Sequence, residues 1–115
     1  MKSIRTAMLC ACATLAACSK PPTYSYDCSP AVALTVQYLN GSGADARAVV
    51  TLDGSTFTLT QERSGSGARY STAAGRSPGA TLVWWNKGNE GTLLEGKASD
   101  VSAPETAIAT CTQAP

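Results

Sequence analysis

The chain has 115 residues, with nine basic residues, eight acidic residues and no histidine, so its formal net charge is +1 at pH 7. This length allows one compact domain with a modest core. A charge that is small and scattered, with no basic run, disfavours electrostatic binding of nucleic acid. The absence of histidine excludes the Ser/His and Cys/His dyads of nucleophilic catalysis.

Residues 1–17 have the pattern of a secretory signal. Lys2 and Arg5 give a short basic start, and the uncharged apolar stretch that follows is too short to span a bilayer. The stretch ends in Leu-Ala-Ala before Cys18, which resembles the lipobox of bacterial lipoproteins, where the cysteine is lipidated and becomes the new N-terminus. We therefore predict a lipoprotein signal peptide over 1–17, a lipidated Cys18 and a lipid-anchored spacer over 18–23. The alternative is ordinary cleavage nearby, with Cys18 left as a spare thiol.

The residues after Cys18 bear on the final location of the protein. Ser19, rather than an aspartate, follows the cysteine. By resemblance to bacterial lipoproteins, this favours the outer membrane, with the domain facing the periplasm. Pro21 and Pro22 make the spacer semi-extended. Loss of the two basic residues of the leader would leave seven basic residues against eight acidic ones, a net charge of −1.

The remaining cysteines favour one disulfide. Cys10 and Cys12 leave with the leader, so the mature chain keeps Cys18, Cys28 and Cys111. If Cys18 carries lipid, the other two are the only possible pair, and an oxidising periplasm would let their disulfide persist between the first and last strands. A metal site is the competing interpretation, but the lack of histidine and of close Cys–Cys spacing disfavours it. We predict no metal and no other cofactor.

Most of the domain alternates apolar and polar residues with the period of half-buried strands. Residues 32–38 form the first clear strand, and residues 40–43 (NGSG) read as a turn. Residues 47–52 form the next strand. Asp53 and Gly54 then give the strongest hairpin signal in the chain, because both central residues of a type I′ turn need positive φ.

The second half continues with short strands and turns. After the return strand with Phe57 and Leu59, the predicted segments are a turn at 64–67, a strand at 68–71, a loop at 75–79, a strand at 81–85, a turn at 86–91, a strand at 92–95, a loop at 99–105 and a strand at 106–111. Seven or eight short strands with little room for helix indicate an all-β fold, either a small antiparallel barrel or a sandwich. We favour the barrel, because closure removes exposed strand edges.

Two segments about twenty residues apart each place one polar side chain beside glycine and aromatic residues. Residues 66–70 (SGARY) carry Ser66, and residues 84–88 (WWNKG) carry Lys87. Glycine permits a sharp turn and aromatic rings are rigid, so the polar group is left projecting. Such tips suit insertion into a groove of another molecule. Taken alone, each has a simpler interpretation as a turn serine or a solvated hairpin lysine.

The neighbours of these side chains leave alternatives open. Trp84 and Trp85 are adjacent on one strand, so their rings point to opposite faces. One belongs to the core and the other is covered by a loop or exposed near Lys87, and the sequence does not decide which. Arg69 either contacts a partner or pairs with a nearby carboxylate. We expect Tyr70 to pack in the barrel wall.

The two motifs, preceded by residues 26–28 (YDC) and followed by Cys111, resemble the membrane-bound inhibitors of C-type lysozyme, the MliC family. The resemblance covers about residues 24–112 and defines the predicted domain, 24–115. It implies an eight-stranded antiparallel β-barrel, here closed by one disulfide. Members usually carry an alanine shortly after the Lys-Gly pair, whereas Gly91 stands in that place here.

The resemblance also implies a function, which is inhibition of C-type lysozyme by plugging its cleft. The inhibitory serine of the family falls on Ser66 and the inhibitory lysine on Lys87. The residues expected to bind the partner are Ser66, Gly67, Arg69, Tyr70, Trp85, Lys87 and Gly88. No catalytic residue is implied.

Two other classes of function compete with this one. A binding module of the same fold could serve as an envelope lipoprotein with another glycosidase or glycan as its target. An enzyme would need paired carboxylates, and nothing in the spacing of the acidic residues brings two together. Those residues are Asp27, Asp45, Asp53, Glu62, Glu90, Glu95, Asp100 and Glu105.

Overall fold

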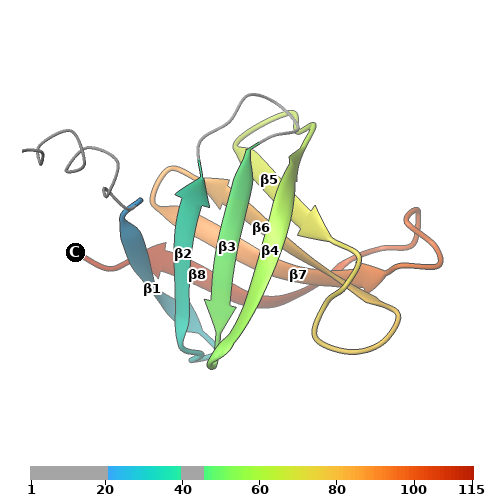
Figure 1. Ribbon diagram of the computed structural model, residues 1–115, viewed down its shortest axis with the longest axis horizontal. Helices are drawn as coiled ribbons and strands as arrows, with labels where there is room; N and C mark the ends of the chain where they lie inside the picture. The colour runs from blue at the N-terminus through green and yellow to red at the C-terminus, as the bar shows by residue number, and fades with distance from the viewer. Residues whose placement is uncertain (1–20, 40–45) are drawn as a thin grey trace, which may run out of the picture.

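The computed structural model describes residues 21–39 and 46–115, which form eight antiparallel strands. Each strand pairs with its neighbour in the chain, and β8 pairs with β1 to close a barrel (Figure 1). The strands are β1 (Thr23–Ser29), β2 (Leu34–Leu39), β3 (Arg47–Leu52), β4 (Ser55–Glu62), β5 (Ala68–Thr72), β6 (Ala80–Lys87), β7 (Glu90–Lys97) and β8 (Thr106–Gln113). The predicted small eight-stranded antiparallel β-barrel is confirmed.

The disulfide lies at the seam where the first and last strands meet. Cys28 of β1 and Cys111 of β8 face each other in register, with their Cα atoms 4.0 Å apart and their sulfurs bonded at 2.06 Å. The predicted pairing is confirmed. It covalently links the two strands whose hydrogen bonds close the barrel.

Several predictions concern residues outside the described part of the chain. These are the signal peptide over 1–17, lipidation of Cys18, the first part of the spacer over 18–23, and the turn at 40–43. The last residue of the predicted spacer, Thr23, already belongs to the barrel, because it begins β1 and pairs with Gln37 of β2. No helix among residues 21–39 and 46–115 is long and apolar enough to cross a membrane.

The hairpin between β3 and β4 shows how local sequence sets the strand register. Asp53 and Gly54 have φ values of 49° and 89°, so both occupy the positive region that a type I′ turn requires. The Asp53 carboxylate also accepts a hydrogen bond from the backbone N–H of Ala33 at 3.0 Å. This register turns Val50 and Leu59 into the barrel, where both are fully buried.

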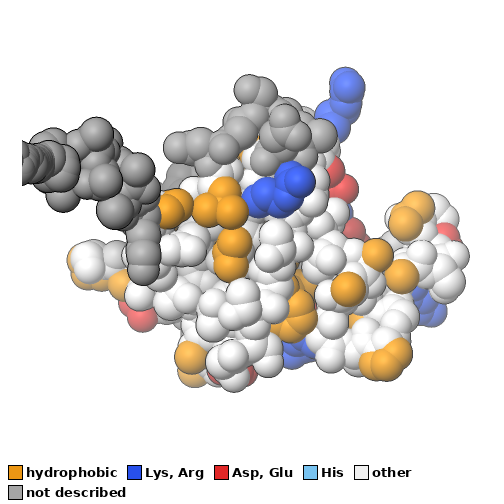
Figure 2. All heavy atoms as spheres, viewed as in Figure 1, with side chains coloured by type: hydrophobic (Ala, Val, Ile, Leu, Met, Phe, Trp, Pro, Cys, Tyr) orange, Lys and Arg blue, Asp and Glu red, His pale blue; other side chains and the backbone are white. Residues whose placement is uncertain are grey.

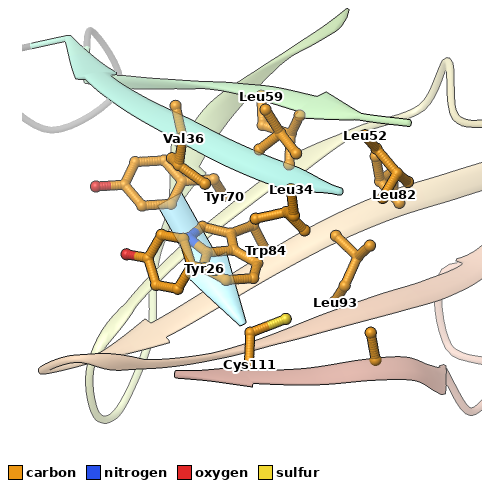
Figure 3. Close-up of a cluster of buried hydrophobic side chains, with 13 residues drawn as sticks. Tyr26, Leu34, Val36, Leu52, Leu59, Tyr70, Leu82, Trp84, Leu93 and Cys111 are labelled. Atoms are coloured by element: carbon orange, nitrogen blue, oxygen red, sulfur yellow. The ribbon is translucent and has the colours of Figure 1, made fainter. Parts of the chain in front are cut away.

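The core fills the inside of the barrel around Trp84, whose side chain is fully buried. Figure 3 draws its indole ring in the middle of the cluster, and the Tyr26 ring packs against it edge-on at 4.9 Å between centroids. The Trp84 Nε1–H donates to the Tyr38 hydroxyl at 2.9 Å, and that hydroxyl lies 3.0 Å from the Tyr26 hydroxyl. The polar tips of these large rings are therefore hydrogen-bonded to one another, as burial requires. The cluster comprises Tyr26, Leu34, Val36, Ala48, Val50, Leu52, Leu59, Tyr70, Leu82, Trp84, Leu93, Ala109 and Cys111.

Two tyrosines make the barrel sensitive to alkali. Burial, together with the hydrogen bond to Tyr26, raises the pKa of Tyr38 far above its ordinary value, and burial also raises the pKa of Tyr70. The folded state therefore disfavours their ionisation. Their contribution to stability is complete below the unfolded pKa near 10 and is lost as pH rises above it. The free energy of unfolding should therefore fall as pH rises past about 10, with a slope that cannot exceed about 1.4 kcal/mol per pH unit for each tyrosine. Urea unfolding between about pH 8 and 11 measures this fall.

Tyr70→Phe isolates the contribution of one tyrosine to this alkaline slope. The variant should lose part of the alkaline slope and keep most of the stability at neutral pH. An unchanged slope would mean that Tyr70 ionises without unfolding.

Gly91 of β7 lies directly against the ring of Trp84. A Cβ atom at this position would lie 2.2 Å from both Cζ2 and Cη2 of the indole, and Gly91 itself is buried. The position therefore accepts only glycine unless Trp84 moves within a packed core. We expect Gly91→Ala to lower the free energy of unfolding by about 1–3 kcal/mol.

Gly65 provides a matched control for this variant, because a Cβ atom there would meet nothing within 4 Å. Gly65→Ala should change stability by less than about 0.5 kcal/mol. Equal urea midpoints for the two variants would show that β7 can move away from Trp84.

Candidate functional site

The two sequence motifs meet at one end of the barrel. Pairing of β5 with β6 sets Ala68 opposite Asn86, which brings the β4–β5 loop beside the end of β6. Gly67 has a φ of 67°, and a Cβ atom on it would lie 2.5 Å from the Asn86 carbonyl oxygen and 2.6 Å from Cγ of Lys87. Glycine is therefore required both by the backbone conformation and by the close approach. We call residues 64–67 together with 85–88 the serine–lysine ridge.

Trp85 joins the two halves of this ridge. Its Nε1–H donates to the carbonyl oxygen of Ser66 at 2.9 Å, and the Nζ atom of Lys87 lies 4.3 Å from its ring centroid. Trp84 points inward and is fully buried, so Trp85 is the outward-facing member of the pair and lies near Lys87. The structure thus resolves which tryptophan belongs to the core.

The polar ends of Ser66 and Lys87 are both exposed. The Ser66 carbonyl also accepts a hydrogen bond from the Ser64 hydroxyl at 2.6 Å, so the loop backbone is held from two sides. Within the described residues, the Ser66 hydroxyl makes no hydrogen bond and the Lys87 ammonium makes no ion pair. A hydroxyl and a cation are therefore presented together on a fixed backbone.

The turn after Lys87 is tighter than the predicted turn over residues 86–91. The strand β6 continues through Lys87 and β7 begins at Glu90, which leaves only two residues in the turn. Gly88 supplies the positive φ of 63°, and the Asn86 side-chain amide donates to the carbonyls of Gly88 and Glu90 at 3.2 and 3.3 Å. The Asn86 side chain thus donates hydrogen bonds to the backbone carbonyls of the turn and closes it. Lys87 is therefore the last residue of a strand and does not lie in a loose loop.

Arg69 is held by two carboxylates. Its Nε atom bonds Glu62 at 2.6 Å, and its Nη2 atom bonds Glu105, which belongs to the segment between β7 and β8. The hydrogen bond to Glu105 raises the pKa of Arg69 further. Of the two interpretations of Arg69, pairing with a carboxylate is the one that the structure shows. Its Cζ atom also lies 5.6 Å from the centroid of the Trp85 ring.

Tyr70 does not lie on the ridge. Its side chain faces the barrel interior, retains 7% exposure and packs against Tyr38 with 5.8 Å between ring centroids. Tyr70 thus packs in the barrel wall as expected, and its role in partner binding stays a prediction. Tyr70 forms part of the wall behind the ridge, because residues alternate between the two faces of β5.

Three residues around the ridge were missed from the sequence. Glu62 lies directly across from Arg69 in the β4–β5 register, so a hairpin alignment could have found it. Asn86 is the first residue of the predicted turn over 86–91, and its side chain closes that turn. The contact between Glu105 and Arg69 joins residues 36 apart and had no local signal. It also brings two carboxylates together, which the sequence spacing did not predict.

Charged side chains do not gather into one patch on the face of the barrel that Figure 2 presents. Figure 2 shows lysine and arginine side chains standing apart from one another on the face that it presents. No group of three or more Cys, Asp or Glu side chains in residues 21–39 and 46–115 is placed to hold a metal ion. Recognition by this protein therefore depends on local geometry, and the serine–lysine ridge is the best-defined polar projection.

Comparison with known proteins gives consistent matches. The family model described as membrane-bound lysozyme-inhibitor of c-type lysozyme matches residues 26–102. A Cupriavidus necator protein named membrane-bound lysozyme inhibitor of C-type lysozyme is 36% identical over 90 residues, covering 78% of this chain and 64% of that protein. A Pseudomonas aeruginosa protein of the same name is 40% identical over 68 residues, covering 59% of this chain and 48% of that protein. The chain thus spans less than two thirds of either relative, and no solved structure matches it.

Proposed function

This chain belongs to the family of membrane-bound lysozyme inhibitors of C-type lysozyme, and on that basis we propose that it inhibits a C-type lysozyme by inserting the serine–lysine ridge into the active-site cleft. The protein would act as a binding partner and would catalyse no reaction. Its benefit to the cell would be protection of peptidoglycan from hydrolysis.

The chemistry of the target explains why these two side chains would suffice. Lysozyme cleaves glycan with two carboxyl groups, one a protonated general acid in an apolar pocket and the other ionised. Lys87 would offer a compact positive charge to the ionised carboxylate. Ser66 both donates and accepts hydrogen bonds, so it would pair with the carboxylic acid in either protonation state.

One observation carries the proposal, which is that the Ser66 hydroxyl and the Lys87 ammonium are exposed on the same ridge. Gly67 lies against the stem of Lys87, and Trp85 contacts both halves of the ridge. Two groups that must satisfy two neighbouring carboxyls need this kind of fixed, shared placement. The family membership supports the identity of the target.

We also propose the location that the leader implies. Lipidation of Cys18 would anchor the protein to the outer membrane with the barrel facing the periplasm. A lipoprotein there would meet lysozyme before the enzyme reaches the cell wall. Mass spectrometry of the membrane fraction tests this, because a lipidated mature N-terminus at Cys18 is expected and an unmodified Cys18 would contradict it.

The test of inhibition uses purified protein from Ser19 onward, so that no anchor is needed. Lysis of bacterial cell walls by a C-type lysozyme should stop at micromolar excess of this protein. A chito-oligosaccharide that occupies the lysozyme cleft should raise the apparent inhibition constant in proportion to its concentration. An apparent inhibition constant that does not change with oligosaccharide concentration would disprove insertion into the cleft. Undiminished lysis would favour a binding module for another glycosidase or glycan.

A further inference from the structure

We infer that Trp85 is the positioning residue of the serine–lysine ridge, acting on a C-type lysozyme through Ser66 and Lys87 and not through a contact of its own. The inference rests on the proposed function for its inhibitory consequence. Its structural part stands on the contacts of the free protein. One side chain links a serine in the β4–β5 loop to a lysine at the end of β6.

The two contacts of Trp85 use different parts of its indole. The N–H donates to the Ser66 carbonyl at 2.9 Å, which fixes the loop backbone from which the hydroxyl projects. The ring face supports the Lys87 ammonium at 4.3 Å from the centroid, within the range of a cation–π interaction. No other natural side chain combines a flat ring of this size with a donor at its edge. Phenylalanine keeps only the ring, and leucine keeps neither.

Trp85 is itself held by its neighbours across the sheet. Arg69 lies directly opposite it on β5, and Glu62 lies opposite Arg69 on β4, so the three form one row over the outer face of the barrel. Two carboxylates bind Arg69, which keeps a second cation beside the indole without leaving it unpaired. Lys87 can therefore share the ring without facing an uncompensated positive charge. Loss of Glu62 or Glu105 would weaken this arrangement.

The expected benefit is preorganisation. A lysine side chain that is free in solution loses rotamer freedom when it binds, and a ring that already orders it reduces that loss. The hydrogen bond and the cation–π contact are each modest. We expect Trp85→Phe to weaken inhibition by about 2- to 10-fold and Trp85→Leu by about 5- to 50-fold.

The decisive experiment is a mutant cycle with lysozyme inhibition as the readout. Trp85→Leu is measured alone and in the Ser66→Ala/Lys87→Ala background, at concentrations that still give measurable binding. If Trp85 acts through those two residues, its substitution adds less than about 2-fold in the double-variant background. A loss there as large as in the wild type would overturn the inference, because Trp85 would then contact lysozyme directly.

A second measurement needs no lysozyme and keeps the inference separate from the proposed function. In protein from Ser19 onward with carbon-13-labelled lysine, the Cε methylene protons of Lys87 should shift upfield because of the ring current of Trp85. Trp85→Leu should remove the shift, and Lys97, an exposed lysine at the end of β7, should not change. Absence of the shift in the wild type would overturn the inference even if inhibition is strong. Its presence in a protein that does not inhibit lysozyme would count against the proposed function alone.

Discussion

Lys87→Ala is expected to weaken inhibition of C-type lysozyme by about 2–5 kcal/mol, which is roughly 30-fold to several thousand-fold in the inhibition constant. In the proposed complex the variant would remove a desolvated cation and leave a lysozyme carboxylate unpaired, so the expected loss is large. Ser66→Ala should also weaken inhibition, by an amount in the lower part of that range. Cell-wall lysis titrated with each variant gives the inhibition constants directly.

Both substitutions should leave the barrel almost unchanged. Ser66 and Lys87 are exposed, and within the described residues their polar ends make no hydrogen bond or ion pair, so the free energy of unfolding should change by less than about 0.5 kcal/mol. Lys97→Ala and Ser102→Ala remove the same kinds of side chain from the exposed region around the end of β7 and should inhibit like the wild type. A fall in melting temperature that parallels the loss of inhibition would show that the ridge residues are structural. If Ser66→Ala and Lys87→Ala both inhibit as well as the wild type, the serine–lysine ridge does not take part in inhibition.

The sequence was informative where local rules determine the outcome. Alternation predicted a half-buried strand over 47–52, and Val50 and Leu52 of β3 are indeed buried. The Asp53–Gly54 pair predicted the hairpin that sets the register of β4. Many short segments that leave little room for helix predicted seven or eight strands in a barrel or a sandwich, and the resemblance to the MliC family implied a barrel of eight. The strands and the hairpin depend on neighbours in the chain, whereas closure of the barrel joins β1 to β8.

The sequence was less informative where distant residues meet. Residues 81–85 are apolar on both faces, and alternation alone could not tell which of Trp84 and Trp85 enters the core. The structure explains the double pattern, because Val83 faces outward and is still buried in a groove that it lines together with Ala98 and Val101. The segment between β7 and β8 thus covers an outer-face residue. Nothing in the sequence near Val83 indicates that a distant segment covers its outer face.

The ridge shows the same division. The two motifs predicted a projecting serine and a projecting lysine, but their shared support by Trp85 depends on how β5 and β6 pair. The extent of the turn after Lys87 was wrong because the Asn86 amide closes it after two residues. Gly91 departs from the alanine that the family usually carries at this place, and the close approach of the Trp84 ring explains the glycine.

Removal of the disulfide is expected to have the largest effect on stability. Cys28 and Cys111 are 83 residues apart, and chain-entropy reasoning gives about 4–5 kcal/mol for a closed loop of this length. That is comparable to the whole stability of a small domain. Loss of the bond frees the seam between β1 and β8, on which closure of the barrel depends. Urea unfolding at pH 7 of protein from Ser19 onward, with and without a reductant, measures the difference.

The paired variant Cys28→Ala/Cys111→Ala separates the cross-link from the packing of the sulfur atoms. Reduced wild type keeps both sulfurs and should lose only the constraint on the unfolded chain. The double variant should lose that constraint and also some core packing, because Cys111 is 4% exposed inside the barrel. Reduction should also steepen the dependence on urea, since the unfolded chain becomes less compact. A reduced protein as stable as the oxidised one would show that β-sheet hydrogen bonds alone hold the seam. In that case the serine–lysine ridge should keep its geometry in a reducing environment, and the proposed inhibition of lysozyme should persist there.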